Sequence, residues 1–424
     1  MATYVSVIRL GNVLGSCARR GGSTGSSIVF NYRHKKSITG SPVHISTPGS
    51  FTGYRHLFSA AALGVDSYEE KREKVAIEFK NLRDKFQQRM QQVLQSDNQS
   101  LIFTEDLKNA IHLAECEDDM SLVIGMAKKF NSQNVGLRFG VYIFGPVVMR
   151  MFHYVNHPQY MLQALRSKEL EGFFDQIASY QLAMDLLYKG GLYQDAIDVF
   201  EELQEKRLNG IKYPKNCLTL AIAACYKINT PESYQKMIEI FEGSQEYGTH
   251  LNVRIISFAS ALALNQGFPH ISIEILSRAF NVRRTTIMNL KVLSLVELGR
   301  VEDALPILRS VLRADLPDTI SRGDSQQIVR NTIERVEQAV KNAGDKELIA
   351  EYNNIAKGLE ANGHISEKPL DEYICEPVAQ LPSKTSKFND RRDRAMLAAS
   401  FNRNRGTQWH ASRNRSRPGL MDME

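Results

Sequence analysis

Side chains able to do chemistry occur in this chain, but few stand at spacings that build a catalytic or metal site. His153 and His157 are four residues apart, which would place two imidazoles on one helical face as a metal pair. Pro158 and the turn before it predict a break between them, so we expect structural roles instead. The acidic run at residues 117–119 resembles a ligand cluster, but acids in front of a helix ordinarily complement its dipole.

The remaining chemistry-bearing residues predict neither an enzyme nor a cofactor. The five cysteines show no paired close spacing, so neither a zinc site nor a disulfide framework is indicated: Cys17, Cys116, Cys217, Cys225 and Cys375. We expect Cys217 and Cys225 to pack inside a helical hairpin. The chain lacks a phosphate-binding glycine loop with its lysine, an HExxH pair and a Gly-x-Ser-x-Gly elbow. We therefore expect a binding protein.

Paired amphipathic helices are the elements that must position any binding side chain. Residues 179–203 indicate two short helices that meet at Gly190-Gly191, and similar pairs return at residues 218–243, 257–276 and 289–308. The middle turns near Gly191, Asn229, Gly267 and Gly299 are 38, 38 and 32 residues apart. Because one hairpin cannot bury its apolar face alone, this pattern predicts an all-α, α-solenoid fold of stacked hairpins.

Fainter hairpins extend the array to about six or seven repeats. They fall at residues 105–130, 141–166 and 328–359, so we expect the solenoid to span residues 104–360. Residues 61–103 precede it. Within them, residues 66–95 carry apolar side chains at helical spacing and predict one amphipathic helix, either an N-terminal cap, which we favour, or a coiled-coil contact. A linker and an Arg-rich disordered tail are expected over residues 361–424.

The hairpin unit resembles the pentatricopeptide repeat. Tyr180, Gly191, Asp195-Ala196 and Phe200-Glu201 fit its pattern, and residues 299–305 repeat its second half. Tetratricopeptide repeats are the competing assignment, but they show a regular 34-residue period and an early aromatic residue, whereas Trp409 is the sole tryptophan here and lies outside the array. The resemblance implies a right-handed solenoid that holds single-stranded RNA.

In that family a polar residue near the start of the first helix, together with the last residue of the repeat, contacts each base. The resemblance places the first-helix position at Gln181, Thr219, Ser257 and Asn289. Asn252 is the matching terminal residue for Thr219, and this pair resembles an adenine reader. Polar residues on a solvated helix face would give the same pattern, so that alternative stays open.

Basic side chains suggest where phosphates would bind. One group lies where a hairpin passes to the next, and a second lies in the tail, interleaved with Phe401 and Trp409: Arg278, Arg283, Arg284 and Lys291, then Arg403, Arg405, Arg413 and Arg415. Arginines beside aromatic residues are typical of a nonspecific single-strand clamp. A solubilising or ribosome-anchoring tail fits the composition equally well. The body at residues 61–383 carries more acidic than basic side chains, which makes general RNA binding harder.

The first sixty residues carry seven arginines and lysines and no acidic residue, a composition typical of a mitochondrial transit peptide. A basic disordered arm is the alternative. No segment offers the roughly eighteen uninterrupted apolar residues of a membrane-spanning helix. The resemblance implies a mitochondrial matrix protein that acts in processing or maturation of transcripts and so supports the respiratory chain. A nuclease or mitoribosomal protein would be its partner. The rival hypothesis is a protein-interaction scaffold.

Overall fold

The computed structural model describes residues 56–96, 100–133, 142–279, 284–312 and 326–377. The expected transit peptide lies almost entirely outside these residues, as does the Arg-rich tail. Five candidate phosphate contacts therefore cannot be placed: Arg283, Arg403, Arg405, Arg413 and Arg415.

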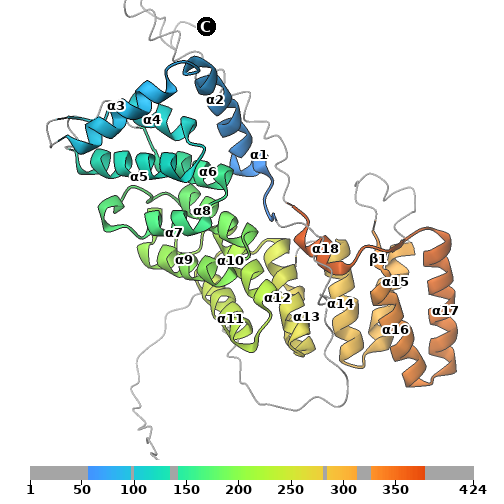
Figure 1. The fold of residues 1–424 in the computed structure, drawn as a ribbon. Coiled ribbons are helices and arrows are strands. Elements are labelled where there is room, and N and C mark those ends of the chain that lie inside the picture. Colours follow the sequence, from blue (N-terminus) through green and yellow to red (C-terminus); the bar gives the residue numbers. More distant parts are fainter. Residues whose placement is uncertain (1–55, 97–99, 134–141, 280–283, 313–325, 378–424) are drawn as a thin grey trace, which may run out of the picture. The chain divides into compact units, whose positions relative to one another are not determined.

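Seven helical hairpins follow one another along the described residues, so the predicted all-α solenoid of helix-turn-helix repeats is confirmed (Figure 1). Their helices are α4 (Thr104–Leu113) and α5 (Glu117–Ser132), α6 (Gly145–Val155) and α7 (Pro158–Leu165), α8 (Ile177–Lys189) and α9 (Tyr193–Lys206), α10 (Lys215–Ile228) and α11 (Pro231–Glu246), α12 (Val253–Asn265) and α13 (Pro269–Ser277), α14 (Thr285–Glu297) and α15 (Val301–Leu312), and α16 (Arg330–Ala343) and α17 (Lys346–Ala361). Short 3-10 turns, η2 (Lys168–Leu170) and η3 (Leu208–Gly210), join neighbouring hairpins.

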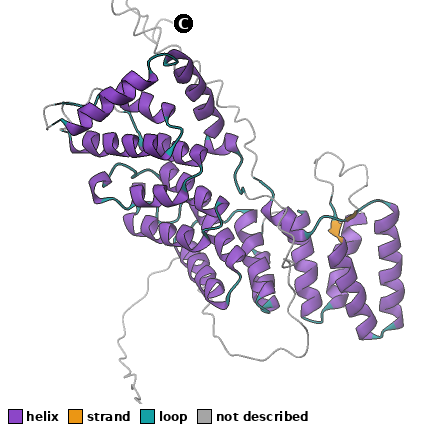
Figure 2. Ribbon diagram, in the orientation of Figure 1, coloured by secondary structure: helices purple, strands orange, loops and turns teal. Residues whose placement is uncertain are grey.

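The turns inside the hairpins form where the sequence placed them. Gly191, Gly267 and Gly299 adopt positive φ angles of 76°, 78° and 72°, and Asn229 adopts 53°, the left-handed conformation that ends helices. Proline opens the second helix of three hairpins, as at Pro158 in α7, because its missing N–H is not needed in a first turn. Helices dominate all of the described segments (Figure 2).

The first helix of each hairpin packs on the first helix of the next, from α4 through α6, α8, α10, α12 and α14 to α16. We call this series the first-helix row. Its centre is buried on every side: each residue from Cys217 to Tyr226 of α10 is buried, and so is each from Ile255 to Asn265 of α12. A helix buried all round needs covering elements on all sides, and α10 is contacted by α8, α9, α11 and α12.

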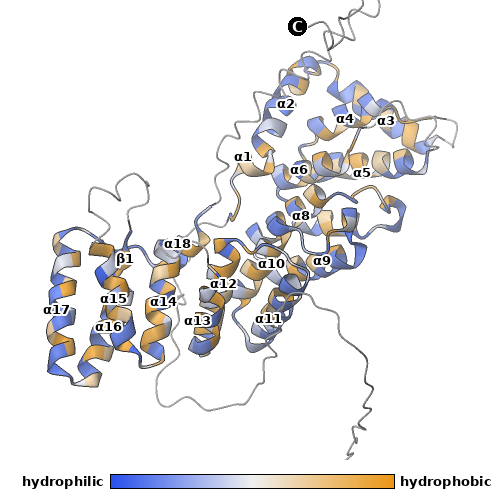
Figure 3. Ribbon diagram, turned by 180° about the vertical axis from the view of Figure 1, so that it is seen from behind, coloured by the Kyte–Doolittle hydropathy of each residue, from blue (hydrophilic) through white to orange (hydrophobic). Residues whose placement is uncertain are grey.

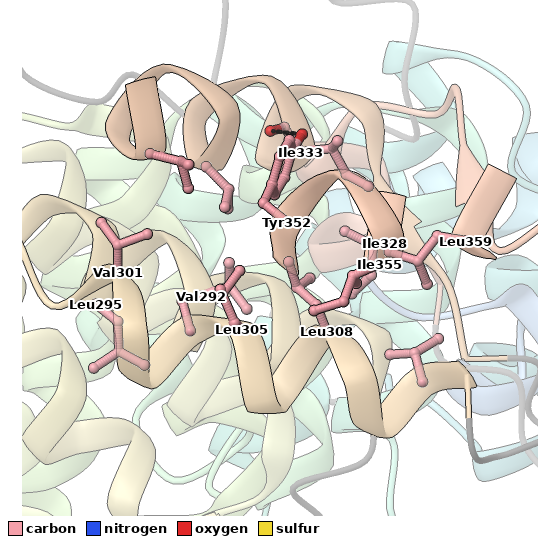
Figure 4. Packing of buried hydrophobic residues seen from close by; sticks show 14 of the residues in the cluster. Val292, Leu295, Val301, Leu305, Leu308, Ile328, Ile333, Tyr352, Ile355 and Leu359 are labelled. Carbon is pink, nitrogen blue, oxygen red and sulfur yellow. Dashed lines mark hydrogen bonds between the residues drawn. The ribbon is translucent and has the colours of Figure 1, made fainter. Parts of the chain in front are cut away.

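The last two hairpins show how amphipathic helices share one core. Apolar side chains from α14, α15, α16 and α17 pack together, including Val292, Leu305, Ile333 and Ile355 (Figure 4). Tyr352 belongs to the same core and donates a hydrogen bond from its hydroxyl to the carbonyl oxygen of Ile333 at 3.2 Å. The outer helix α17 carries both hydrophobic and hydrophilic residues (Figure 3), as an end helix must.

The N-terminal segment differs from its prediction as one amphipathic helix. It forms α1 (Ala60–Leu63), α2 (Val65–Glu78) and α3 (Arg83–Gln95), with a break between Phe79 and Leu82. The break lets α2 pack on α4 and α6 while α3 packs on α5. The hydroxyl of Tyr68 donates to the Ile111 carbonyl oxygen at 2.7 Å, so tertiary contacts with the first hairpin hold α2 in place.

The C-terminal segment also departs from prediction, because ordered elements occupy part of the expected linker. Strand β2 (Ile365–Ser366) pairs in parallel with β1 (Ile328–Val329), which precedes α16. Helix α18 (Leu370–Cys375) then packs against α12 and α14 (Figure 1). Six residues are too few to produce a detectable helical period, so no sequence pattern indicates this element.

Candidate nucleic-acid interface

The residues predicted to contact bases form hydrogen bonds between successive hairpins. The Gln181 side chain on α8 accepts a hydrogen bond from the Asn216 amide at the start of α10, at 3.1 Å. One hairpin further on, Thr219 accepts from Asn252 at 3.1 Å. Each bond therefore joins neighbouring first helices.

The same pattern continues toward the C-terminus. The Ser257 hydroxyl on α12 lies 3.4 Å from the Thr286 hydroxyl on α14, and donates to it. Asn289 on α14 bridges to the next hairpin through both ends of its amide. Its nitrogen donates to the Gln327 carbonyl oxygen at 3.1 Å, and its oxygen accepts from the Val329 backbone N–H at 2.9 Å. We call these four links the inter-hairpin ladder.

Burial separates the ladder residues into two groups. Thr219, Ser257 and Asn289 are 1 %, 2 % and 0 % exposed, so a base has almost no access to them in this arrangement. Gln181 and Asn252 are only half-buried, although Asn252 also caps α12 by accepting from the Ile255 N–H at 2.7 Å. The sequence could not distinguish the two uses, because reading a base and joining two hairpins both need a hydrogen-bonding side chain near the start of a first helix.

The expected cluster of cations is divided between the two faces of the hairpins. Arg278, just after α13, pairs with Glu274 at 3.6 Å and lies 5.9 Å from the ring centroid of Phe241 on α11. Its neighbours are therefore second helices. Arg284, in contrast, is the exposed N-cap residue of α14 on the first-helix side, and Lys291 is half-buried further along α14.

A pocket of about 310 Å³ lies where α12, α14 and α18 meet. It is lined by Arg254 and Arg284, together with Ser257, Thr285, Thr286, Gln327, Tyr373 and Glu376. Burial lowers the pKa of Arg254, and its Nη1 atom is buried without a hydrogen-bond partner. Both cations stand at the start of a first helix, where the helix dipole also favours an anion. Sequence reasoning missed Arg254 because nothing in its spacing distinguishes it from other surface arginines.

Helix α18 is fixed to the first-helix row by a charged contact that the sequence did not suggest. The Lys227 ammonium at the end of α10 lies 3.1 Å from both carboxylate oxygens of Asp371. The Tyr226 hydroxyl donates to the same carboxylate at 2.9 Å. Burial raises the pKa of the Cys375 thiol beside this contact to about 12.

The two histidines that could have formed a metal pair have separate partners. His153 Nε2 lies 3.0 Å from Asp185 Oδ2 in the interior, whereas His157 Nδ1 lies 3.4 Å from Glu117 at a more exposed position. Across the segments that the structure describes, no group of three or more His, Cys, Asp or Glu side chains could hold a metal ion. Among the helices described, none is long and apolar enough to cross a bilayer.

Comparison with known proteins connects this architecture to one set of relatives. The chain is 25 % identical over 338 residues to pentatricopeptide repeat-containing protein 2, mitochondrial, of Homo sapiens, covering 80 % of this chain and 84 % of that protein. The protein of the same name from Xenopus laevis is 26 % identical, covering 76 % and 81 %, and that from Mus musculus is 28 % identical, covering 70 % and 74 %. No family model matches the chain. The similarity supports both the repeat type and the mitochondrial location that the sequence predicts.

Proposed function

We propose that this chain, similar over most of its length to mitochondrial pentatricopeptide repeat proteins, binds single-stranded RNA in the mitochondrial matrix. It takes part in processing or maturation of mitochondrial transcripts, and through them supports the respiratory chain. The observation that carries the proposal is the unbroken row of seven first helices in a chain with these relatives. Helical repeats can read single-stranded RNA at about one base per repeat, with two or three side chains on each base.

The starts of the first helices are the part of the row best suited to RNA. Gln181 and Asn216 lie exposed or half-exposed near the starts of α8 and α10, and Asn252, Arg254 and Arg284 at the starts of α12 and α14. We call these five residues the helix-start edge. The amides can pair with base edges, while the guanidinium groups and helix dipoles favour phosphates. Base reading is therefore assigned to Gln181 and Asn252.

The charge of the chain shapes how RNA would bind. Because the body carries more acids than bases, affinity must come from local cations such as Arg254 and Arg284, and from the tail residues Arg403, Arg405, Arg413 and Arg415. Bound RNA would be held, shaped and presented to a partner nuclease or shielded from one. Any chemical step on the RNA would then be carried out by that partner.

The proposal is tested with a pool of random-sequence 20-nucleotide single-stranded RNA and the full chain. The slope of log affinity against log salt is negative, and each phosphate contact removed makes it shallower by about 0.7. Changing both Arg254→Gln and Arg284→Gln should therefore weaken binding several-fold and make the slope shallower by about 1.4. The matched control is Arg278→Gln, which removes a cation from the second-helix side.

Two results would contradict RNA binding along the row. The control removes one charge and could weaken binding about half as much, on a logarithmic scale, as the double variant, which would mean that only net charge matters. Changing Arg403, Arg405, Arg413 and Arg415 of the tail to glutamine could also abolish all binding while the double variant binds normally, and the row would then have no part. Selection of sequences bound by Gln181→Ala should show altered preference at one position. Unaltered preference would remove base reading from Gln181.

A protein-interaction scaffold is the second candidate, and one observation favours it. The first-helix row already holds a short peptide helix, α18, against α12 and α14. In this alternative the row receives a helix of a mitoribosomal or assembly partner. Binding to that partner would then persist in the Arg254→Gln and Arg284→Gln double variant, and no RNA would bind at any salt concentration.

A further inference from the structure

The chain reverses direction after its last hairpin and returns along the row that it has just built. Gly363 follows α17 with a φ of 68°, which only a residue free to adopt left-handed backbone accepts easily. Strand β2 then pairs with β1, and the Tyr373 hydroxyl donates to Gln327 Oε1 at 2.7 Å. From there α18 packs on α14 and α12, and Asp371 reaches α10. The return thus passes the first helices of three successive hairpins.

Helix α18 sits on the row through both apolar and charged contacts. Leu370, Ile374 and Cys375 are 5 %, 2 % and 4 % exposed, so one face of the helix is fully seated. The side chain of Lys227, which pairs with Asp371, is only 7 % exposed. A six-residue helix is not stable in isolation, because helix nucleation is unfavourable. Its order therefore depends on these contacts, and it unfolds when they are broken.

The position of α18 conflicts with RNA bound along the row. Tyr373 and Glu376 form the wall of the pocket that also holds Arg254 and Arg284. The carboxylate of Glu376 attracts the Arg254 guanidinium electrostatically. It therefore plays the part that a phosphate of bound RNA would play. Helix α18 therefore closes the row at the starts of α12 and α14 in the described structure.

We propose that α18 is an autoinhibitory strap, and that single-stranded RNA binds along the row by displacing it. The inference rests on the proposed function. The strap covers the first helices of the fifth and sixth hairpins, and Asp371, which pairs with Lys227 at the end of the fourth hairpin's first helix, is its latch. RNA that reaches the starts of α12 and α14 exchanges the acids of the strap for phosphates, so the free protein is closed and the bound protein is open.

Cys375 supplies a direct measure of strap position. Its thiol lies on the buried face of the strap, whereas Cys116 is exposed and Cys217 and Cys225 are buried within α10. In the full chain with Cys17→Ser and Cys116→Ser, iodoacetamide labelling of Cys375 is followed by mass spectrometry. The 20-nucleotide random single-stranded RNA pool is the probe. We expect saturating RNA to speed labelling of Cys375 at least tenfold, with Cys217 and Cys225 unchanged.

A second measurement uses the affinity for the same RNA. Ile374→Asp places a charge in the apolar seat of the strap and should release it, which raises RNA affinity at least fivefold. The substitution adds a negative charge, so electrostatics alone would lower the affinity. Glu372→Asp on the same helix preserves charge at a half-buried position and should leave affinity unchanged.

The outcomes separate the inference from the function on which it rests. If RNA binds but labelling of Cys375 stays constant or slows, the strap is not displaced and the inference is overturned while RNA binding stands. If Ile374→Asp speeds labelling yet does not strengthen RNA binding, the strap is mobile but not inhibitory, which also overturns it. If RNA binds neither the parent chain nor the Ile374→Asp variant, the proposed function fails and the strap proposal fails with it.

Discussion

Asn289 should hold the last hairpin to the rest of the array, and its removal should loosen that hairpin alone. The side chain is 0 % exposed and joins α14 to the segment before α16 through Gln327 and Val329. Asn289→Ala removes both links. The Val329 N–H lies in a residue that is only 2 % exposed, so water cannot easily replace the lost acceptor.

The size of the effect follows from those groups. A buried donor left without an acceptor costs about 1–3 kcal/mol, and each lost hydrogen bond that water can replace costs about 1 kcal/mol. We therefore expect the free energy of opening α16 and α17 to fall by about 3 kcal/mol, which is on the order of a hundredfold in an equilibrium constant. In a repeat array such a loss stays local, because each hairpin contacts only its neighbours.

Hydrogen exchange read by mass spectrometry measures this opening region by region. Amides of α16 and α17 should exchange about a hundredfold faster in Asn289→Ala, while those of α8 to α11 keep their rates. The matched control is Asn354→Ala, an exposed position on α17 where a change within about 0.5 kcal/mol is expected. Unchanged exchange in α16 and α17 would refute the linking role, and equal acceleration across the array would refute its local character.

Three further predictions concern other parts of the chain. Gly145→Ala should destabilise the fold by about 1–3 kcal/mol in denaturant titration, since an added Cβ would lie 2.9 Å from the backbone oxygen of Phe173. Burial lowers the pKa of His112 below its usual 6.5, so the unfolded state takes up the proton first, and stability should fall as pH drops below about 6.5. His112→Gln should reduce that acid dependence. Asp371→Ala removes the carboxylate that pairs with a buried lysine and should loosen α18 by about 2 kcal/mol, so that Cys375 is labelled faster without RNA.

Each of these three predictions has a control substitution elsewhere in the same chain. Gly190→Ala should be near neutral, because an added Cβ there meets its nearest atom at 3.4 Å and φ is −76°. His250→Gln changes an exposed histidine and should leave the acid dependence intact. Glu372→Gln should not change the labelling of Cys375. The reasoning for Gly145 is contradicted if Gly145→Ala is as stable as the parent. The reasoning for His112 is contradicted if His112→Gln leaves the acid dependence of stability unaltered. The reasoning for Asp371 is contradicted if Asp371→Ala leaves the labelling of Cys375 unchanged.

Local sequence determined the hairpins because helices and turns form through interactions between residues close together in the chain. Apolar residues at helical spacing define each helix, and glycine or asparagine supplies the left-handed turn, so Gly191, Asn229, Gly267 and Gly299 could be identified without coordinates. Stacking then follows from the need of each hairpin to bury one face. The resemblance to the pentatricopeptide repeat, rather than this local reasoning, singled out the polar positions Gln181, Thr219, Ser257 and Asn289 near the starts of first helices.

Tertiary structure alone decided what those polar positions do and what covers them. Whether Thr219 faces a base or a neighbouring hairpin depends on how closely two helices approach, and the structure joins it to Asn252. The break between α2 and α3 depends on their docking to different partners. The pairing of Asp371 with Lys227 joins residues 144 positions apart. Helix α18 is likewise seated on helices far from it in the sequence, and its six residues are too few to show a period. Such long-range contacts leave no local pattern, since each partner alone is an ordinary charged residue.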